Sequence, residues 1–158
     1  GMWLFQNIRR NLNKSMTYDE MMELAKSSNN YKYFDVNDST LVAPKNMIDA
    51  IGKLIGSDDL SFILNSAYHS LAKSYSEAVM EIEDVTGKRF NAIHIVGGGC
   101  QDKYLNALTR DYTKKSVTAG PIEATATGNI VSQIIFDKKI SLATARDLIK
   151  NSFDIKEI

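Results

Sequence analysis

The sequence predicts a mixed α/β domain that is mostly helical and contains one short parallel β-α-β unit. Up to about residue 90, apolar residues recur at helical spacing. From Asn91 the pattern changes to a β-branched run at 92–96, which ends in three glycines. A second short strand is expected at 116–119, after an intervening helix. This order is typical of two parallel strands joined by a crossover helix.

The N-terminal segment predicts two short helices followed by a loop. The first helix carries an apolar stripe below a basic outer face; the stripe consists of Trp3, Leu4, Ile8 and Leu12. The second begins with a capping box, Thr17-x-x-Glu20, in which side chains at both positions satisfy free backbone amides. Ser, Asn, Asp and Tyr dominate residues 27–44, which we interpret as an ordered loop.

Two further helices are expected before residue 90. The first runs from about Lys45 to Ile55 and ends at Gly56. Ser57 or Asp58 caps the next, which runs to about Thr86. Its apolar stripe consists of Leu60, Ile63, Leu64, Ala67, Leu71, Tyr75, Ala78, Val79 and Ile82.

The remainder of the chain predicts a β-α-β-α unit and a final helix. The strands at 92–96 and 116–119 flank a helix at 101–112, and a second helix follows at 122–136. We therefore divide a single partial domain, 1–158, into a mainly helical part at 1–90, this unit at 91–136 and a C-terminal helix at 141–153.

Composition and charge exclude several classes of protein. Nineteen basic residues balance nineteen acidic ones, so no strong field attracts nucleic acid or an anionic membrane surface. Cys100 is the single cysteine, which excludes a disulfide-stapled scaffold and favours a reducing, cytoplasmic compartment. No apolar run has the length of a membrane span.

The residues Gly97, Gly98 and Gly99 form the most informative motif. Between a strand and a helix they allow a ligand to approach the backbone closely, near the free amides of a helix N-terminus. Neither the dinucleotide fingerprint nor the P-loop fits, because both need glycine where Asp102 stands. Taken alone, the motif indicates either a ligand site or a tight structural turn.

A second glycine turn, Gly120-Pro121, favours the ligand interpretation. It is followed by a helix whose first residues, 122–129, are mostly small. Two such turns at the same end of adjacent parallel strands are typical of ligand sites in open α/β sheets, and a nucleotide is the natural candidate. No catalytic residue or metal site is indicated: His69 and His94 lack partner ligands at metal-binding spacing.

Residues 93–102 read Ile-His-Ile-Val-Gly-Gly-Gly-Cys-Gln-Asp, and residues 118–129 read Thr-Ala-Gly-Pro-Ile-Glu-Ala-Thr-Ala-Thr-Gly-Asn. These two segments closely resemble the L-rhamnulose kinases of the FGGY family of carbohydrate kinases. Shorter matches lie at 2–6, 35–47, 83–88 and 141–146. The resemblance therefore spans essentially the whole chain.

The resemblance implies a partial actin-like, ribonuclease H-like ATPase domain. It implies an intact enzyme that uses ATP and Mg²⁺ to phosphorylate the 1-hydroxyl of L-rhamnulose. It also implies that Gly97, Gly98 and Gly99 lie against the adenosine and the α-phosphate, with Gln101 and Asn106 as companions in the nucleotide site.

Several features of the family are missing from this sequence. It resembles only the later part of the C-terminal domain, and it lacks the Gly-x-His-Asp-Thr segment that carries the family's general base. We therefore expect a fragment that is inactive without the N-terminal kinase domain, with two strands and an exposed edge at 92–96 through which it could form a homodimer. The alternatives are a stand-alone helical interaction module and the remnant of a degraded kinase gene.

Overall fold

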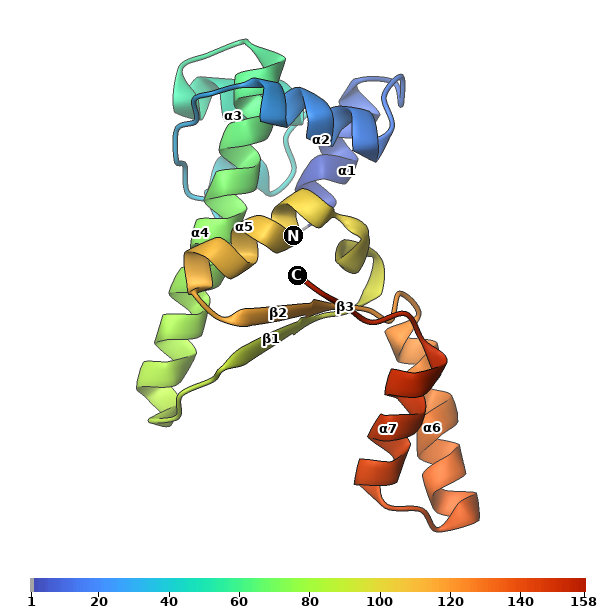
Figure 1. The fold of residues 1–158 in the computed structure, drawn as a ribbon. Coiled ribbons are helices and arrows are strands. Elements are labelled where there is room, and N and C mark those ends of the chain that lie inside the picture. The colour runs from blue at the N-terminus through green and yellow to red at the C-terminus, as the bar shows by residue number, and fades with distance from the viewer. Residues whose placement is uncertain (1) are drawn as a thin grey trace.

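The computed structural model describes residues 2–158, in which helices predominate (Figure 1). The helices are α1 (Trp3–Asn11), α2 (Tyr18–Ser27), α3 (Met47–Ile55), α4 (Leu60–Thr86), α5 (Lys103–Thr113), α6 (Ala124–Lys138) and α7 (Leu142–Ser152). The strands are β1 (Ala92–Ile95), β2 (Ser116–Ala119) and β3 (Lys156–Glu157), and two 3₁₀ turns are η1 (Ser39–Leu41) and η2 (Gly97–Gln101). None of the helices in this described part is long and apolar enough to cross a lipid bilayer.

The hydrophobic core lies between α4 and the helices around its first half. Helices α1, α2 and α3 surround this half at one end of the molecule, and α5 crosses it beside the sheet (Figure 1). The buried side chains of the core include Phe5, Ile8, Met21, Leu41, Met47, Ile51, Ile63, Leu64, Tyr68, Leu105 and Leu108. The amphipathic patterns before residue 90 thus pack as expected of helices that bury one stripe.

The N-terminal caps follow side-chain chemistry. The predicted capping box is confirmed: Thr17 Oγ1 accepts a hydrogen bond from the Glu20 amide, and the Glu20 carboxylate accepts one from the Thr17 amide. The predicted cap of α4 was wrong, because Asp59 takes that role and accepts from the Ser61 amide at 2.9 Å. Ser57 instead accepts from the Asp59 amide and stabilises the preceding turn.

Three other predictions differ from the structure. Trp3 is exposed, because α1 turns Leu4, Phe5 and Ile8 toward the core instead. The stripe of α4 is buried only in its first half, so Ile82 reaches solvent near the helix end. Helices α5 and α6 each begin two residues later than expected, since the glycine run forms its own 3₁₀ turn and residues 121–123 form a turn ahead of α6.

The sheet confirms the predicted parallel pair and adds a strand. Strands β1 and β2 are parallel, with Ile93 beside Val117, and β3 pairs antiparallel with the other edge of β2. The sequence did not indicate β3, because two charged residues show no strand pattern; the free edge of β2 recruits them. Within residues 2–158 the outer edge of β1 has no strand beside it, which agrees with the exposed edge expected at 92–96.

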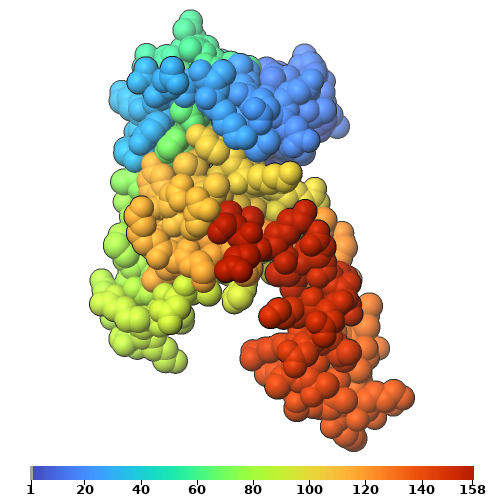
Figure 2. Space-filling view, in the orientation of Figure 1, coloured from blue at the N-terminus to red at the C-terminus, as the bar shows by residue number. Residues whose placement is uncertain are grey.

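Helices α6 and α7 form an arm that stands away from the body (Figures 1 and 2). The two helices pack on each other, and Thr127 and Ala145 are their only residues described as buried. Large apolar side chains of the arm remain exposed; they are Ile130, Phe136, Leu142 and Leu148. Such a surface is unusual for a domain that is complete by itself.

A buried carboxylate fastens the end of α4 to the sheet. Glu83 accepts hydrogen bonds from Lys115 Nζ at 2.7 Å, the Phe90 amide at 2.8 Å and Arg89 at 3.0 Å. These three donors, led by Lys115, lower the pKa of Glu83 from 4.5 to about 2. Because the folded-state pKa is depressed, this cluster stabilises the fold above about pH 4.5, and the contribution is lost as the pH falls toward 2.

Replacing Glu83 tests this clamp. We expect Glu83→Gln to lower the melting temperature at pH 7, because Lys115 would stay largely buried without its counter-charge. The variant should also lose part of the decline in stability between pH 4.5 and pH 2. Thermal unfolding across this range is the measurement, and Glu81→Gln, an exposed carboxylate on the same helix, is the control. Equal melting temperatures for both variants at pH 7 would contradict the assignment.

Candidate functional site

The two glycine turns meet at one end of the parallel strands, as the sequence predicted. The Gly97 amide donates to the Pro121 carbonyl at 3.1 Å, and the Gly120 amide donates to the Ile95 carbonyl at 2.9 Å. These reciprocal bonds bind the end of β1 to the end of β2. The glycine loop, residues 97–101, is therefore fixed at its first residue by the neighbouring strand.

The glycines of this region serve different purposes. Gly97 has φ +76°, in the left-handed region that favours glycine, and Gly120 has φ +120° with the Asp154 carbonyl 3.1 Å from where a Cβ would lie. Gly98 is different, because its φ is ordinary and an added Cβ would meet no atom within 4 Å. Neither backbone conformation nor a close neighbour therefore requires glycine at 98.

A cleft of about 830 Å³ opens beside the exposed side of the glycine loop. Helix α1 and the residue before it supply one wall, α2 and its cap supply a second, and the loop with the start of α5 forms the floor. The lining residues are Met2, Gln6, Arg9, Thr17, Tyr18, Asp19, Met22, Gly98, Gly99, Gln101, Asp102 and Lys103. The cleft thus joins apolar, aromatic, basic and acidic side chains to backbone without side chains, and apolar walls with a few polar groups are common in ligand sites.

The remaining predicted site residues take different positions around the loop. Gln101 is exposed and lines the cleft. Asn106 is 1% exposed and lies behind the loop, where its Nδ2 donates to the Cys100 carbonyl at 2.9 Å. Its Oδ1 is buried and has no hydrogen-bond partner among the described residues. An unpaired buried acceptor costs roughly 1–3 kcal/mol, so this asparagine is unfavourable for stability alone.

Asp102, which the sequence marked only as a break in known motifs, is the anchor of the loop. Its Oδ1 accepts from the Leu105 amide at 3.0 Å and so caps α5, while its Oδ2 accepts from the Tyr68 hydroxyl at 2.9 Å. Its own amide donates to the Gly99 carbonyl at 3.2 Å. Burial raises the pKa of Asp102 despite these bonds. The Asp-x-x-Leu spacing was compatible with a helix cap, but Tyr68 lies 34 residues away and gave no local signal.

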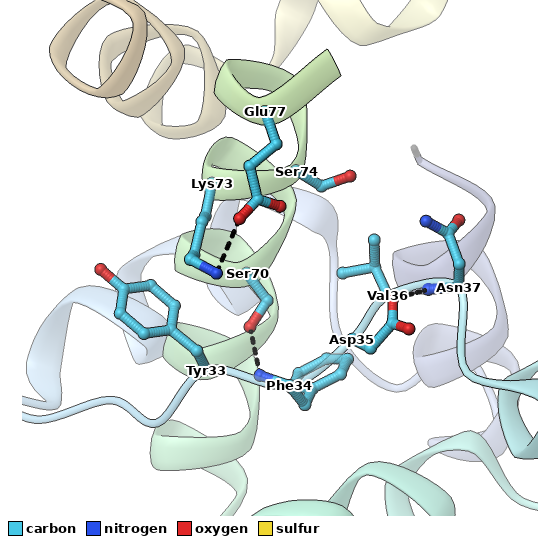
Figure 3. A pocket seen from close by; sticks show the side chains of 9 residues that line it. All are labelled: Tyr33, Phe34, Asp35, Val36, Asn37, Ser70, Lys73, Ser74 and Glu77. Atoms are coloured by element: carbon cyan, nitrogen blue, oxygen red, sulfur yellow. Dashed lines mark hydrogen bonds and ion pairs between the residues drawn. The ribbon is translucent and has the colours of Figure 1, made fainter. Parts of the chain in front are cut away.

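A second pocket, of about 450 Å³, lies between the loop 33–37 and α4 (Figure 3). Lys73 and Glu77 pair with each other at 2.8 Å across its wall, and Ser70 Oγ accepts from the Phe34 amide at 3.1 Å. Asp35 Oδ1 accepts from the Asn37 amide, a side-chain turn of the kind that ordered loops rich in Asp and Asn form. Of these contacts, the bond between Phe34 and Ser70 holds the loop on α4, and we interpret the pocket as a structural seam between the two.

The histidines have structural surroundings. The His69 ring stacks on Tyr31 at 3.6 Å between centroids, and its nitrogens contact the hydroxyls of Tyr112 and Tyr104. His94 contacts Thr118 on the neighbouring strand at 2.6 Å. Within residues 2–158 no group of three His, Cys, Asp or Glu side chains is arranged to hold a metal ion.

Comparison with known proteins shows the family of this chain. The C-terminal domain of the FGGY family of carbohydrate kinases matches residues 1–135. The chain is 40% identical to the rhamnulokinase of Halalkalibacterium halodurans over 99% of its own length, 35% identical to that of Bacillus subtilis over 99%, and 33% identical to that of Oceanobacillus iheyensis over 98%.

These matches cover only part of each relative. The chain spans 35% of the length of the first of these proteins and 34% of the other two. The expected fold class, a mostly helical part of an actin-like domain with a short parallel unit, is confirmed. The chain belongs to the FGGY family of carbohydrate kinases, of which it represents the C-terminal domain.

Proposed function

We propose that this chain is the part of an ATP-dependent sugar kinase that holds the adenosine and α-phosphate of the nucleotide. In the whole protein the γ-phosphate of ATP would pass to the 1-hydroxyl of L-rhamnulose, giving L-rhamnulose 1-phosphate. The rhamnulokinase name of the relatives supports the sugar, and membership of the carbohydrate kinase family supports the reaction class. The single cysteine favours a reducing compartment, and we propose the cytoplasm.

The open backbone at Gly98 is the observation that carries this proposal. Gly98 and Gly99 lie on the floor of the 830 Å³ cleft, and a side chain at 98 would project into free space. The phosphate and ribose of a nucleotide need this kind of close approach to peptide groups. Gln101 borders the same cleft, and Arg9 and Lys103 bring positive charge to its rim.

The chain fits the nucleotide but leaves the transfer step to other segments. Phosphoryl transfer consists mainly of positioning and charge stabilisation, and Mg²⁺ would supply part of that charge. Since residues 2–158 show no candidate metal cluster, we propose that the protein groups near the metal, the general base and the sugar site belong to the portion that the relatives have in addition. This chain alone would therefore bind nucleotide and transfer nothing.

Exposed apolar side chains indicate where that additional portion docks. They lie at the end of α4, beside the free edge of β1 and along the arm, and include Val85, Phe90, Val96, Ile130 and Phe136. The end of α4 and the arm extend past the sheet on its two sides, and Figure 2 shows a hollow between them. A partner that adds a strand to β1 and covers these helices would bury the surface.

Calorimetric titration with Mg-ATP tests the nucleotide site. We expect the chain to bind Mg-ATP, and we expect Gly98→Val to abolish binding with little change in melting temperature, because Gly98 borders the cleft and a Cβ at this position meets no atom within 4 Å. Adenosine should compete with ATP. A folded chain that shows no heat of binding, or a Gly98→Val variant that binds like the parent, would overturn the proposal.

Size-exclusion chromatography tests the docking surface. The upstream portion of the Halalkalibacterium halodurans relative, outside the matched segment, should co-elute with this chain. Phe136→Asp should weaken the complex, since Phe136 is 76% exposed and would carry a charge into the contact. Gln133→Asp, on the same helix, adds the same charge as a control. If the chain does not co-elute with this portion and elutes as a homodimer, this choice of partner is contradicted.

A further inference from the structure

We propose that Tyr68 and Asn106 are positioning residues that hold the glycine loop in its nucleotide-binding conformation from behind. The inference rests on the nucleotide-binding function proposed above and extends it to two buried side chains that border no part of the 830 Å³ cleft. Tyr68 acts through the carboxylate of Asp102, and Asn106 acts through the carbonyl of Cys100.

Tyr68 links the floor of the cleft to one of its walls. Its hydroxyl donates to Asp102 Oδ2, while its ring lies 4.2 Å from the ring of Phe5, centroid to centroid, on α1. Phe5 neighbours Gln6, which faces the cleft. One rigid, 2% exposed side chain on the central helix thus contacts both the loop anchor and the helix opposite it, and so fixes the width of the cleft.

At position 68, tyrosine is less favourable than phenylalanine for the packing of the core alone. A hydroxyl among buried residues must find a partner, and the partner here is a carboxylate that burial also disfavours. Phenylalanine would pack against Phe5 and Tyr104 without drawing a charged group inward. What the hydroxyl adds is a fixed position for Asp102, the residue that ends the glycine loop and begins α5.

Asn106 supports the same inference by an independent contact. The hydrogen bond of its side chain goes to the Cys100 carbonyl within the loop, and its Oδ1 stays unpaired among the described residues. Behind it lies an apolar hollow of about 390 Å³ whose walls include Tyr75, Ile93 and Ile95. Leucine has nearly the same shape and would suit these neighbours. Asparagine is therefore less favourable than leucine for burial at this position, but it can donate a hydrogen bond to the Cys100 carbonyl and leucine cannot.

Amide hydrogen exchange and nucleotide titration on three variants test the proposal. Tyr68→Phe and Asn106→Leu should each speed exchange at the Gly97, Asp102 and Leu105 amides about tenfold, the factor that corresponds to one lost hydrogen bond. Both should also weaken Mg-ATP binding about tenfold. Asn106→Leu should leave the melting temperature nearly unchanged, because the removal of an unpaired buried acceptor offsets the loss of the bond to the Cys100 carbonyl. This separation of affinity from stability is what a purely structural role would not produce.

Tyr112→Phe is the matched control, because it removes a hydroxyl that contacts His69 and Tyr33 at the far end of α5. It should leave loop exchange and affinity at the parent values. The proposal would be overturned if amide exchange in the loop were unchanged in both test variants. It would also be overturned if exchange in α2 rose as much as exchange in the loop. If the parent chain binds no Mg-ATP, the nucleotide function fails separately, and the exchange rates alone still decide whether these side chains hold the loop.

Discussion

The packing of helix α4 is the constraint on which the rest of the molecule depends. Its first half is surrounded by α1, α2 and α3, and its buried side chains include polar ones that reach outward to neighbouring segments. Asn65 donates to the Ser28 and Asn30 carbonyls, and Ser66 accepts from the Lys32 amide. Because buried polar groups must be paired, these contacts allow only one placement of the loop on the helix. Its last turns then set the sheet in place through Glu83.

The same helix connects the core to the candidate site. An apolar core tolerates small shifts of its helices, but a cleft for a nucleotide requires defined spacing between its walls. Tyr68 supplies that spacing because it packs on α1 and bonds to the loop anchor at once. The reciprocal bonds of Gly97 and Gly120 fix the other side of the loop to the strands. The loop is thereby held on both sides, while its face toward the cleft stays bare at Gly98.

Local chemistry made much of this predictable from the sequence. The capping box at Thr17 and the helix end at Gly56 depend on residues close together in the chain, and the meeting of the two glycine turns follows from the parallel pairing that the strand pattern predicted. What could not be predicted depends on distant partners. β3 forms because β2 offers an edge, the end of α4 is exposed because nothing in residues 2–158 covers it, and the role of Asp102 depends on Tyr68.

The distribution of polar and apolar surface matches a domain that works as part of a larger protein. The end that carries α1, α2 and α3 holds most of the hydrophobic core, although Trp3 and Tyr18 stay partly exposed there. The end that carries the arm and the free edge of β1 exposes large apolar side chains. This division of the surface is compatible with a chain that spans about a third of the length of its relatives.

A nucleotide titration followed by amide NMR is the most direct test of whether the cleft beside the glycine loop binds nucleotide in this chain alone. With Mg-ATP added to the labelled chain, the amide signals of Gly98, Gly99, Gln6 and Tyr18 should move together, because these residues share one cleft. The signals of Lys73 and Glu77, in the seam between the loop 33–37 and α4, should stay in place. Stationary signals around the glycine loop at saturating nucleotide, or shifts centred on Lys73 and Glu77, would contradict a nucleotide half-site in this chain.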